Sequence, residues 1–390
     1  MIPEIRKNFN ENFSERKYQD FLTELNSVLK YPTEFRVCET PLFLSDELTK
    51  ELYQACNDII SQIQQKDFLI RSEDAIPENL KVPNDFEHPL FLQLDFGITK
   101  NDNSFIPKLI ELQAFPSLYA YQVYLDEIIR KHFEIPNGFS SYFNNFDKNS
   151  YQSLLTKLIV SNHDPVNVIL LEIEPEKQKT RIDFAATEEL TGITTVCLSK
   201  IKKRGSKLYY DKGGKEIEIK RIYNRVIFDE LERKKLSFDF NFKDKIDAEW
   251  AGHPNWFFKI SKFSLPLLKG KYTPECFYLN ELTNYPANLE SFVLKPLFSF
   301  AGLGVETDIT KEKLDTIENK SNYILQQKVE YAPLIETPDG YSKVEIRMMF
   351  LWDDKPKLVN NLIRTSKGKM MGVDFNKNKT WVGSSIAYHR

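Results

Sequence analysis

The stretch Ser291–Glu306 reads SFVLKPLFSFAGLGVE and is the most informative segment of the chain. Its first residues predict a short strand that delivers Lys295, and Pro296 ends the strand because it has no N–H group to continue the ladder. The small residues that follow let backbone N–H groups approach a polyphosphate, and the lysine adds a compact positive charge. This is not a P-loop, because the lysine precedes the glycines. The predicted phosphate-binding residues are Lys295, Ser299, Gly302 and Gly304; a plain hairpin with a surface lysine is the alternative.

A second strand-like run, Tyr323–Glu330 (YILQQKVE), follows this loop. Its apolar first half predicts a buried strand, and its polar second half would offer backbone groups to the edge of an adenine ring. The residues concerned are Gln326, Gln327, Lys328 and Val329. Any buried strand can have a similar sequence, so this segment is informative only together with the others.

Two arginines lie on successive predicted strands near the end of the chain. Arg347 belongs to Val344–Trp352 and Arg364 to Lys357–Thr365, which we expect to form a hairpin. Both arginines have apolar neighbours, so both can point from one face of a sheet into a cleft. There, guanidinium groups would bind a transferring phosphoryl group or an anionic substrate. The alternative is a salt bridge to Glu345 or to another nearby acid.

A second predicted hairpin lies much earlier, with strands at 90–98 and 105–113 joined by the turn-forming residues TKNDNS. Asp95 lies on its first strand, and Glu111 and Gln113 lie two residues apart on its second, so all three can share one face. Carboxylate and amide oxygens are hard ligands that suit Mg²⁺. The trio therefore predicts a magnesium site, with a solvated sheet face as the alternative.

Composition excludes several classes of protein. The chain has 390 residues, 41% hydrophobic and 28% charged, which is typical of a globular protein with room for two or three domains. The net charge of −3 provides no overall basic field, so we expect no nucleic-acid partner. The one basic run, Lys200–Lys207, contains Gly205 and predicts a solvated hairpin arm.

Neither a membrane nor an oxidising compartment is indicated. No apolar run approaches the length of about 18 residues that a membrane span needs, and the first residues contain no apolar signal region. The four cysteines are far apart and form no CxxC pair, which favours a reducing compartment. We therefore expect a cytoplasmic protein without a membrane partner. The sequence does not indicate an oligomeric state.

Helix and strand patterns predict an α/β (α+β) fold with three parts. Apolar spacing predicts helices at 12–29, 45–63 and 117–133, and the stretch 136–149 has the composition of a linker. Strands at 166–173, 194–199 and 221–228 alternate with a helix at 177–190, which indicates a small parallel or mixed sheet. We expect domains at 1–135, 136–250 and 251–390.

Together these segments resemble the ATP-grasp superfamily. In that family one lysine precedes a proline-marked turn and a second lies in a Lys-Pro strand before a glycine loop. Here the first resembles Lys262, with Lys259 as the alternative, and the second resembles Lys295. The metal motif normally comes last, whereas its counterpart here is the early hairpin with Asp95 and Glu111. That order is similar to circularly permuted ATP-grasp proteins such as glutathionylspermidine synthetase.

The resemblance implies a Rossmann-like pre-ATP-grasp domain in the middle of the chain and a cytoplasmic enzyme that uses ATP and Mg²⁺. It implies an ADP-forming ligase that joins a small carboxylate to an amine through an acyl phosphate, acting on an amino acid, a peptide or a polyamine-type substrate. In one departure, Gln113 stands where the family usually has asparagine. A kinase-like phosphotransferase and a non-catalytic nucleotide-binding protein are the alternatives. Arg225 is a candidate anchor for a substrate carboxylate, against an ordinary salt bridge.

Overall fold

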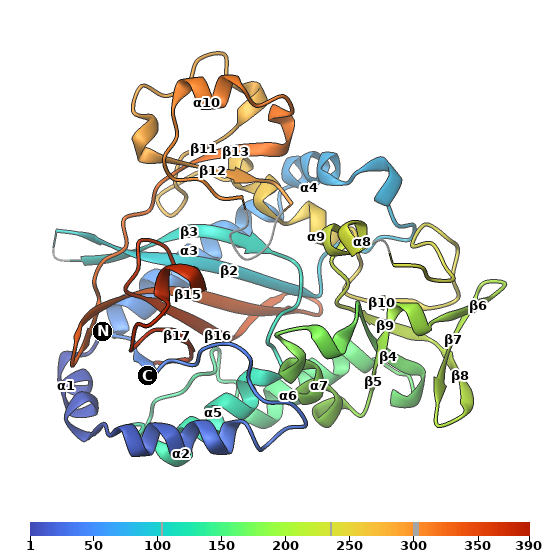
Figure 1. Ribbon diagram of the computed structural model, residues 1–390, viewed down its shortest axis with the longest axis horizontal. Helices are drawn as coiled ribbons and strands as arrows, with labels where there is room; N and C mark the ends of the chain where they lie inside the picture. The colour runs from blue at the N-terminus through green and yellow to red at the C-terminus, as the bar shows by residue number, and fades with distance from the viewer. Residues whose placement is uncertain (103, 235, 299–303) are drawn as a thin grey trace.

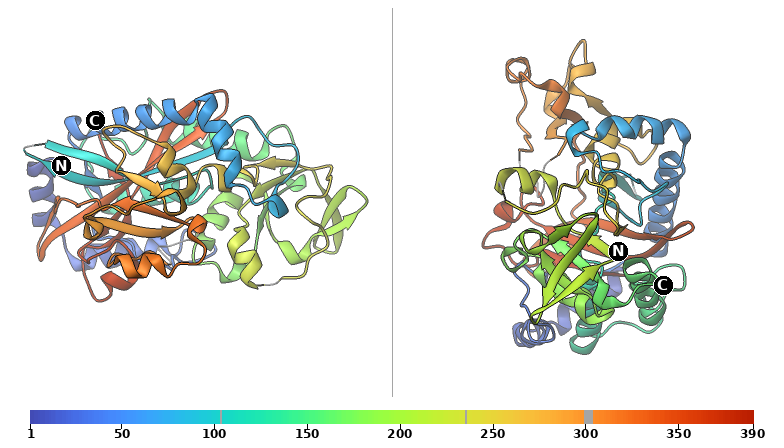
Figure 2. Two further views of the ribbon diagram at one scale, coloured as in Figure 1. Left: turned by 90° about the horizontal axis from the view of Figure 1, so that it is seen from above. Right: turned by 90° about the vertical axis from the view of Figure 1, so that its right-hand side faces the viewer.

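The computed structural model describes residues 1–102, 104–234, 236–298 and 304–390 as a mixed α/β protein (Figure 1). A large antiparallel sheet occupies the centre, and a small three-stranded lobe lies above it in that view. A parallel sheet lies to one side, and the helices Pro3–Asn12, Glu15–Leu25 and Tyr121–His132 lie along the base (Figures 1 and 2). No helix of the described residues is both long and apolar enough to cross a membrane.

The central sheet joins strands from opposite ends of the chain. Its order is β17-β16-β15-β2-β3, with β14 also paired to β15, and every pairing is antiparallel. The early hairpin β2–β3 is therefore extended by β15, a strand that follows it by more than two hundred residues. The strands are β2 (Phe91–Asn101), β3 (Ser104–Gln113), β14 (Ile335–Thr337), β15 (Gly340–Trp352), β16 (Pro356–Ser366) and β17 (Gly383–Ser385).

One face of this sheet is apolar and packs on a long helix. Leu94 and Ile346 point to that face and share a core with Leu52 and Ile59 of α3 (Asp46–Ile63). The helix predicted at 45–63 is present, and Ser45 caps its start because its side chain accepts a hydrogen bond from Leu48 N at 3.4 Å. Because strand side chains alternate, the opposite face is left for the polar residues.

The middle of the chain forms a four-stranded sheet in which all pairings are parallel, in the order β10-β9-β4-β5. A separate antiparallel sheet, β6–β8, projects from it at one end of the molecule (Figure 1). The basic run forms part of this arm, and Arg204 pairs there with Glu216. The elements are α6 (Lys148–Val160), β4 (Val168–Glu172), α7 (Arg181–Thr191), β5 (Thr194–Cys197), β6 (Lys202–Arg204), β7 (Lys207–Lys212), β8 (Lys215–Ile219), β9 (Arg221–Asn224), α8 (Phe228–Lys234), β10 (Glu249–Ala251) and α9 (Trp256–Lys259).

The small lobe contains the Lys-Pro strand and both ends of the predicted glycine loop. Its sheet has the order β11-β13-β12 and encloses a core of its own around Leu294 and Leu325. The predicted strands at 291–295 and 323–329 are both present, with slightly different ends. The elements are the 3₁₀ helix η6 (Lys262–Leu267), β11 (Cys276–Tyr278), β12 (Phe292–Pro296), α10 (Lys311–Asp315) and β13 (Tyr323–Gln327).

The N-terminal third differs most from the sequence-based expectations. The helix predicted at 12–29 is shorter, because Ser14 caps its start by accepting a hydrogen bond from Lys17 N. A separate helix precedes it, which the apolar spacing does not indicate. The remaining elements are α1 (Pro3–Asn12), α2 (Glu15–Leu25), β1 (Leu42–Phe43), α4 (Lys66–Ser72), α5 (Tyr121–His132) and β18 (Ala387–Tyr388), with β1 and β18 paired in parallel.

The stretch 136–149 has the composition of a linker but is packed against the core. Ser141 and Phe143 are fully buried, and Phe143 N donates to Val359 O at 3.1 Å. Ser140 pairs with His389 near the other end of the chain. Its Gly, Asn and Ser residues therefore form turns within a packed segment, and the proposed domain limits remain predictions.

Candidate active site

Lys295 of the small lobe reaches the early hairpin. Its Nζ donates to the carbonyl oxygen of Ile110 at 3.1 Å, and Gln326 Nε2 donates to Leu109 O at 3.2 Å. The register of β2 and β3 shifts just after Asp95, so Ile110 has no partner across the pair. This bulge leaves a carbonyl for the lysine to contact.

A second buried lysine lies beside the same hairpin. Lys262, in η6, is 5% exposed, and its Nζ lies 3.9 Å from Glu111 Oε1. Burial lowers the pKa of Lys262, against the pull of Glu111, and burial likewise lowers the pKa of Lys295. Buried ammonium groups are unfavourable unless an anion compensates them. The two lysines therefore form a place where a bound anion would be stabilised.

Lys259, the alternative first lysine, lies elsewhere. Its Nζ pairs with Glu73 Oε1 at 2.6 Å and with Asp85 Oδ2 at 3.2 Å, and it lies over the ring of Trp256. The geometry thus favours Lys262 over Lys259 as the partner of Lys295.

The polar face of the central sheet carries a network of ion pairs. Arg347 binds Asp95 through two hydrogen bonds, Nε to Oδ1 at 2.6 Å and an Nη to Oδ2 at 2.7 Å. Arg364 contacts the same Oδ2 at 3.2 Å and also pairs with Glu345. Burial alone would raise the pKa of Asp95, but the charge and hydrogen bonds of Arg347 outweigh it, and the pKa is lowered.

Both predicted arginines thus share one face of the sheet, and both are bound to acids. Burial opposes the charge of Arg347, yet Asp95 raises its pKa. The side chain of Arg347 is 12% exposed and that of Arg364 is 40% exposed. Arg364 is therefore the arginine that an anion can approach from solvent.

Tyr331 is a site residue that the sequence reading missed. Its hydroxyl donates to Glu345 Oε2 at 2.9 Å, while Ala332 N donates to Ile98 O at 2.8 Å. A Cβ on Gly97 would lie 2.8 Å from the ring of Tyr331. Gly97 therefore makes room for the tyrosine to lie on the hairpin. A glycine inside a strand is the available signal, since it often marks a close approach of this kind.

The three predicted metal ligands do not form a cation cage. Glu111 and Gln113 line a hollow together with Lys262, whereas Asp95 does not line it and has both oxygens bound to Arg347. The Gln113 amide donates to Gln93 Oε1. Within the described part of the chain, no group of three His, Cys, Asp or Glu residues could hold a metal. The trio therefore does not form a complete protein cage, whereas proteins usually hold Mg²⁺ through one or two carboxylates together with waters and substrate phosphates.

The same hollow is small. Its volume is about 20 Å³, and the side chains that close it include Phe257 and Phe298. That volume holds about one water molecule. A triphosphate does not fit inside this hollow as it stands.

The predicted glycine loop is described at its two ends. Leu294 and Glu306 exchange two backbone hydrogen bonds of 2.9 Å, which bring the ends together. Gly304 has φ +72°, and a Cβ there would lie 2.8 Å from Pro296 Cγ, so this position requires glycine. Ser299 and Gly302 lie outside the described residues.

Two backbone N–H groups of the predicted adenine-binding segment are already hydrogen-bonded within the small lobe. Gln327 N donates to Glu275 O and Lys328 N donates to Ser291 O, each at 2.8 Å. The Gln326 side chain contacts the hairpin, as described above. If this segment holds adenine, it does so through groups other than these two N–H donors, and Val329 is the next residue along the chain.

Arg225 forms the ordinary salt bridge. It follows β9, is 3% exposed, and donates to Asp183 Oδ2 at 2.9 Å. The guanidinium group also lies over the rings of Phe115 and Phe184.

Comparison with known proteins places the fold. No protein-family model matches the chain, and no curated protein matches it. Among solved structures it is similar to a glutathione synthetase-like effector from Globodera pallida in its apo form. The TM-score is 0.55 at 10% sequence identity, over 100% of this chain and 97% of that chain. At this identity the likeness shows the fold alone: the chain has a distant glutathione synthetase-like fold.

Proposed function

We propose that the protein is an ATP-dependent ligase that joins a small carboxylate to an amine. The observation that carries this proposal is the meeting of Lys262 and Lys295 with Glu111 of the hairpin, described above, between two parts of the chain far apart in sequence. The fold related to ATP-grasp proteins supports it. The proposed substrate is an amino acid, a peptide or a polyamine-type molecule.

Each basic side chain has a proposed role. Lys262 and Lys295 bind the α- and β-phosphates of ATP, where their buried charges are compensated. Arg364, with Arg347 beside it, neutralises the charge that develops on the transferring phosphoryl group. Among the described residues, these cations lie with the carboxylates Asp95, Glu111 and Glu345, and the charge of Asp229 also acts on Lys262. The burial of both lysines favours an anionic ligand between them.

The reaction follows from this placement. A substrate carboxylate oxygen attacks the γ-phosphorus, the bond to the β-phosphate oxygen breaks, and ADP leaves. The amine nitrogen then attacks the acyl carbon, a C–N bond forms, and phosphate leaves while the amine loses a proton. Positioning and charge neutralisation suffice for these steps, and no nucleophilic side chain is needed.

The proposed architecture is circularly permuted. Its support is the pairing of β2 with β15, which puts the early hairpin next to a strand near the end of the chain. We propose that the parallel sheet β10-β9-β4-β5 corresponds to the Rossmann-like domain that precedes the nucleotide-binding part. ATP use in related folds implies Mg²⁺, but the residues here do not fit a magnesium cage, and no step is assigned to the metal. A cytoplasmic location remains part of the proposal.

One observation favours a second candidate. Asp95 is held by both arginines, so a non-catalytic protein that binds nucleotide through its lysines is the alternative function. The phosphotransferase alternative shares every contact described above.

The deciding experiment measures ADP release from ATP across amino acids, short peptides and polyamines, singly and in pairs. The ligase predicts ADP and inorganic phosphate together, with phosphate release dependent on the amine. A phosphotransferase would form ADP and a stable phosphorylated product with one substrate alone. Binding of ATP without ADP formation for any pair would contradict both enzymes and support the non-catalytic alternative.

A further inference from the structure

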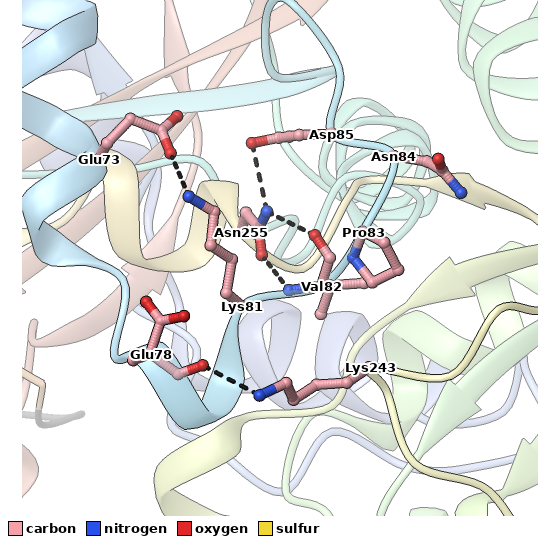
Figure 3. A pocket seen from close by; sticks show the side chains of 9 residues that line it. All are labelled: Glu73, Glu78, Lys81, Val82, Pro83, Asn84, Asp85, Lys243 and Asn255. Atoms are coloured by element: carbon pink, nitrogen blue, oxygen red, sulfur yellow. Dashed lines mark hydrogen bonds and ion pairs between the residues drawn. The ribbon is translucent and has the colours of Figure 1, made fainter.

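A larger hollow lies beside Asn255, the residue just before α9. Its volume is about 450 Å³, within the range of small-molecule sites (Figure 3). Phe257 and Ile260 line the small hollow instead, and the two hollows have no lining residue in common. Its lining comes from the segment 73–85 and from Lys243 and Asn255.

The wall of the hollow is held in place by a buried amide. Asn255 is 1% exposed, and its Oδ1 accepts from Val82 N while its Nδ2 donates to Val82 O, each at 2.9 Å. The same Nδ2 lies 3.3 Å from Asp85 Oδ2 (Figure 3). Both backbone groups of Val82 are thus bound by one side chain. The segment 82–85 is a fixed wall and not a loose surface loop.

Most charges around the hollow are already paired. Lys259 lies behind the wall and binds both Glu73 and Asp85. Lys81 Nζ lies 3.3 Å from Glu73 Oε2. These pairs keep the acids in place and leave their charge compensated.

Glu78 and Lys243 are different. Within the described part of the chain neither has an ion-pair partner. Lys243 Nζ reaches the backbone carbonyl of Glu78 at 3.2 Å, and the Glu78 carboxylate points away from it (Figure 3). Both side chains are exposed, so the hollow presents to solvent one negative and one positive side chain that no ion pair among the described residues neutralises.

We propose that this hollow binds a zwitterionic small molecule of the amino-acid or dipeptide class. The ammonium group of the ligand lies at Glu78 and its carboxylate at Lys243. A ligand with both charges compensates both side chains, whereas a ligand with one charge compensates only one. The site shares no residue with the lysine site and does not depend on nucleotide. It is thus independent of the proposed ligase activity.

The test is a binding titration of the full chain by ligand-observed NMR with glycylglycine as the probe. N-acetylglycine, which has only the negative charge, and glycinamide, which has only the positive charge, are the comparison probes. We expect saturable binding of glycylglycine and binding about fivefold weaker for each singly charged probe, the size expected for one exposed ion pair.

Two substitutions locate the site. E78Q and K243Q should each weaken glycylglycine binding about fivefold. The matched controls E318Q and K311Q remove one charge of each sign from exposed positions of the small lobe and should leave the affinity unchanged. The proposal is overturned if glycylglycine does not saturate, if all three probes bind alike, or if E78Q and K243Q bind it as the unsubstituted chain does.

Discussion

The central sheet and the parallel sheet each hold a buried arginine–aspartate pair, but the two pairs have different surroundings. Arg225 binds Asp183, which also accepts from Leu118 N and Tyr121 N at 3.0 Å, so this aspartate fixes the local backbone. Arg347 binds Asp95 beside a half-exposed arginine and two buried lysines. The first cluster is closed to solvent, whereas the second is open at Arg364, whose side chain is 40% exposed. Access from solvent, more than burial of the pair, distinguishes a candidate site from a structural cluster.

Breaking the closed cluster should have the largest effect. R225A leaves Asp183 buried without its cation, and removing one partner of a buried pair costs about 4 kcal/mol. Urea denaturation should show this loss in the free energy of unfolding. R233A, which breaks an exposed pair with Asp229, is the matched control and should cost less than about 1 kcal/mol. Equal losses in the two variants would mean that Arg225 is not structurally important.

The closed cluster should also make the stability of the protein depend on pH, through Glu172 of the parallel sheet. Burial raises the pKa of Glu172 to about 8 from 4.5, although Arg225 nearby lowers it. Because the folded pKa is higher than the unfolded one, folding carries no penalty below pH 4.5. The penalty grows as the pH rises to about 8 and is constant above that.

We therefore expect E172Q to match the unsubstituted chain near pH 4 and to be more stable by about 3 kcal/mol at pH 9, given about 1.4 kcal/mol per pKa unit and partial relaxation. Denaturation curves at the two pH values measure the difference. A gap of the same size at both would show that Glu172 does not titrate in this range.

The open cluster should respond in function and not in stability. K295A removes a proposed phosphate ligand and should weaken ATP binding about 100-fold, or about 2.7 kcal/mol. The unfolding free energy should hardly fall, because a buried cation is lost together with its charge. K311A, at an exposed position of the same lobe, is the control for a titration by calorimetry. Unchanged affinity in K295A would exclude the proposed nucleotide site.

The smallest effect concerns the contact between Gly97 of the early hairpin and Tyr331. G97A places a Cβ against the ring of Tyr331, and such overpacking costs about 1–2 kcal/mol. In a Y331A background, G97A should cost much less than it does in the unsubstituted chain. A double-mutant cycle of urea denaturation curves measures this difference. Purely additive effects would show that the two residues do not interact.

Local patterns predicted the parts of the site but not their connections. The hairpin strands, the helix that begins after Ser45 and the Lys-Pro strand can each be predicted from residues close together in the sequence. The pairing of Arg347 with Asp95 joins residues 252 positions apart, and its register depends on which strands become neighbours. Because a shift of one residue reverses the face of every side chain, local periodicity cannot predict such pairs. Tyr331 was missed for the same reason.

The order of strands in the central sheet also affects synthesis. The hairpin β2–β3 leaves the ribosome long before β15. One edge of β2 therefore has no paired strand while most of the chain is made. Strands with exposed edges and apolar faces are prone to aggregate, and pairings of high sequence separation form slowly. Helix α3, made just before the hairpin, can cover its apolar face in the meantime. We expect a nascent chain that ends before residue 340 to be compact around α3 but dependent on chaperones.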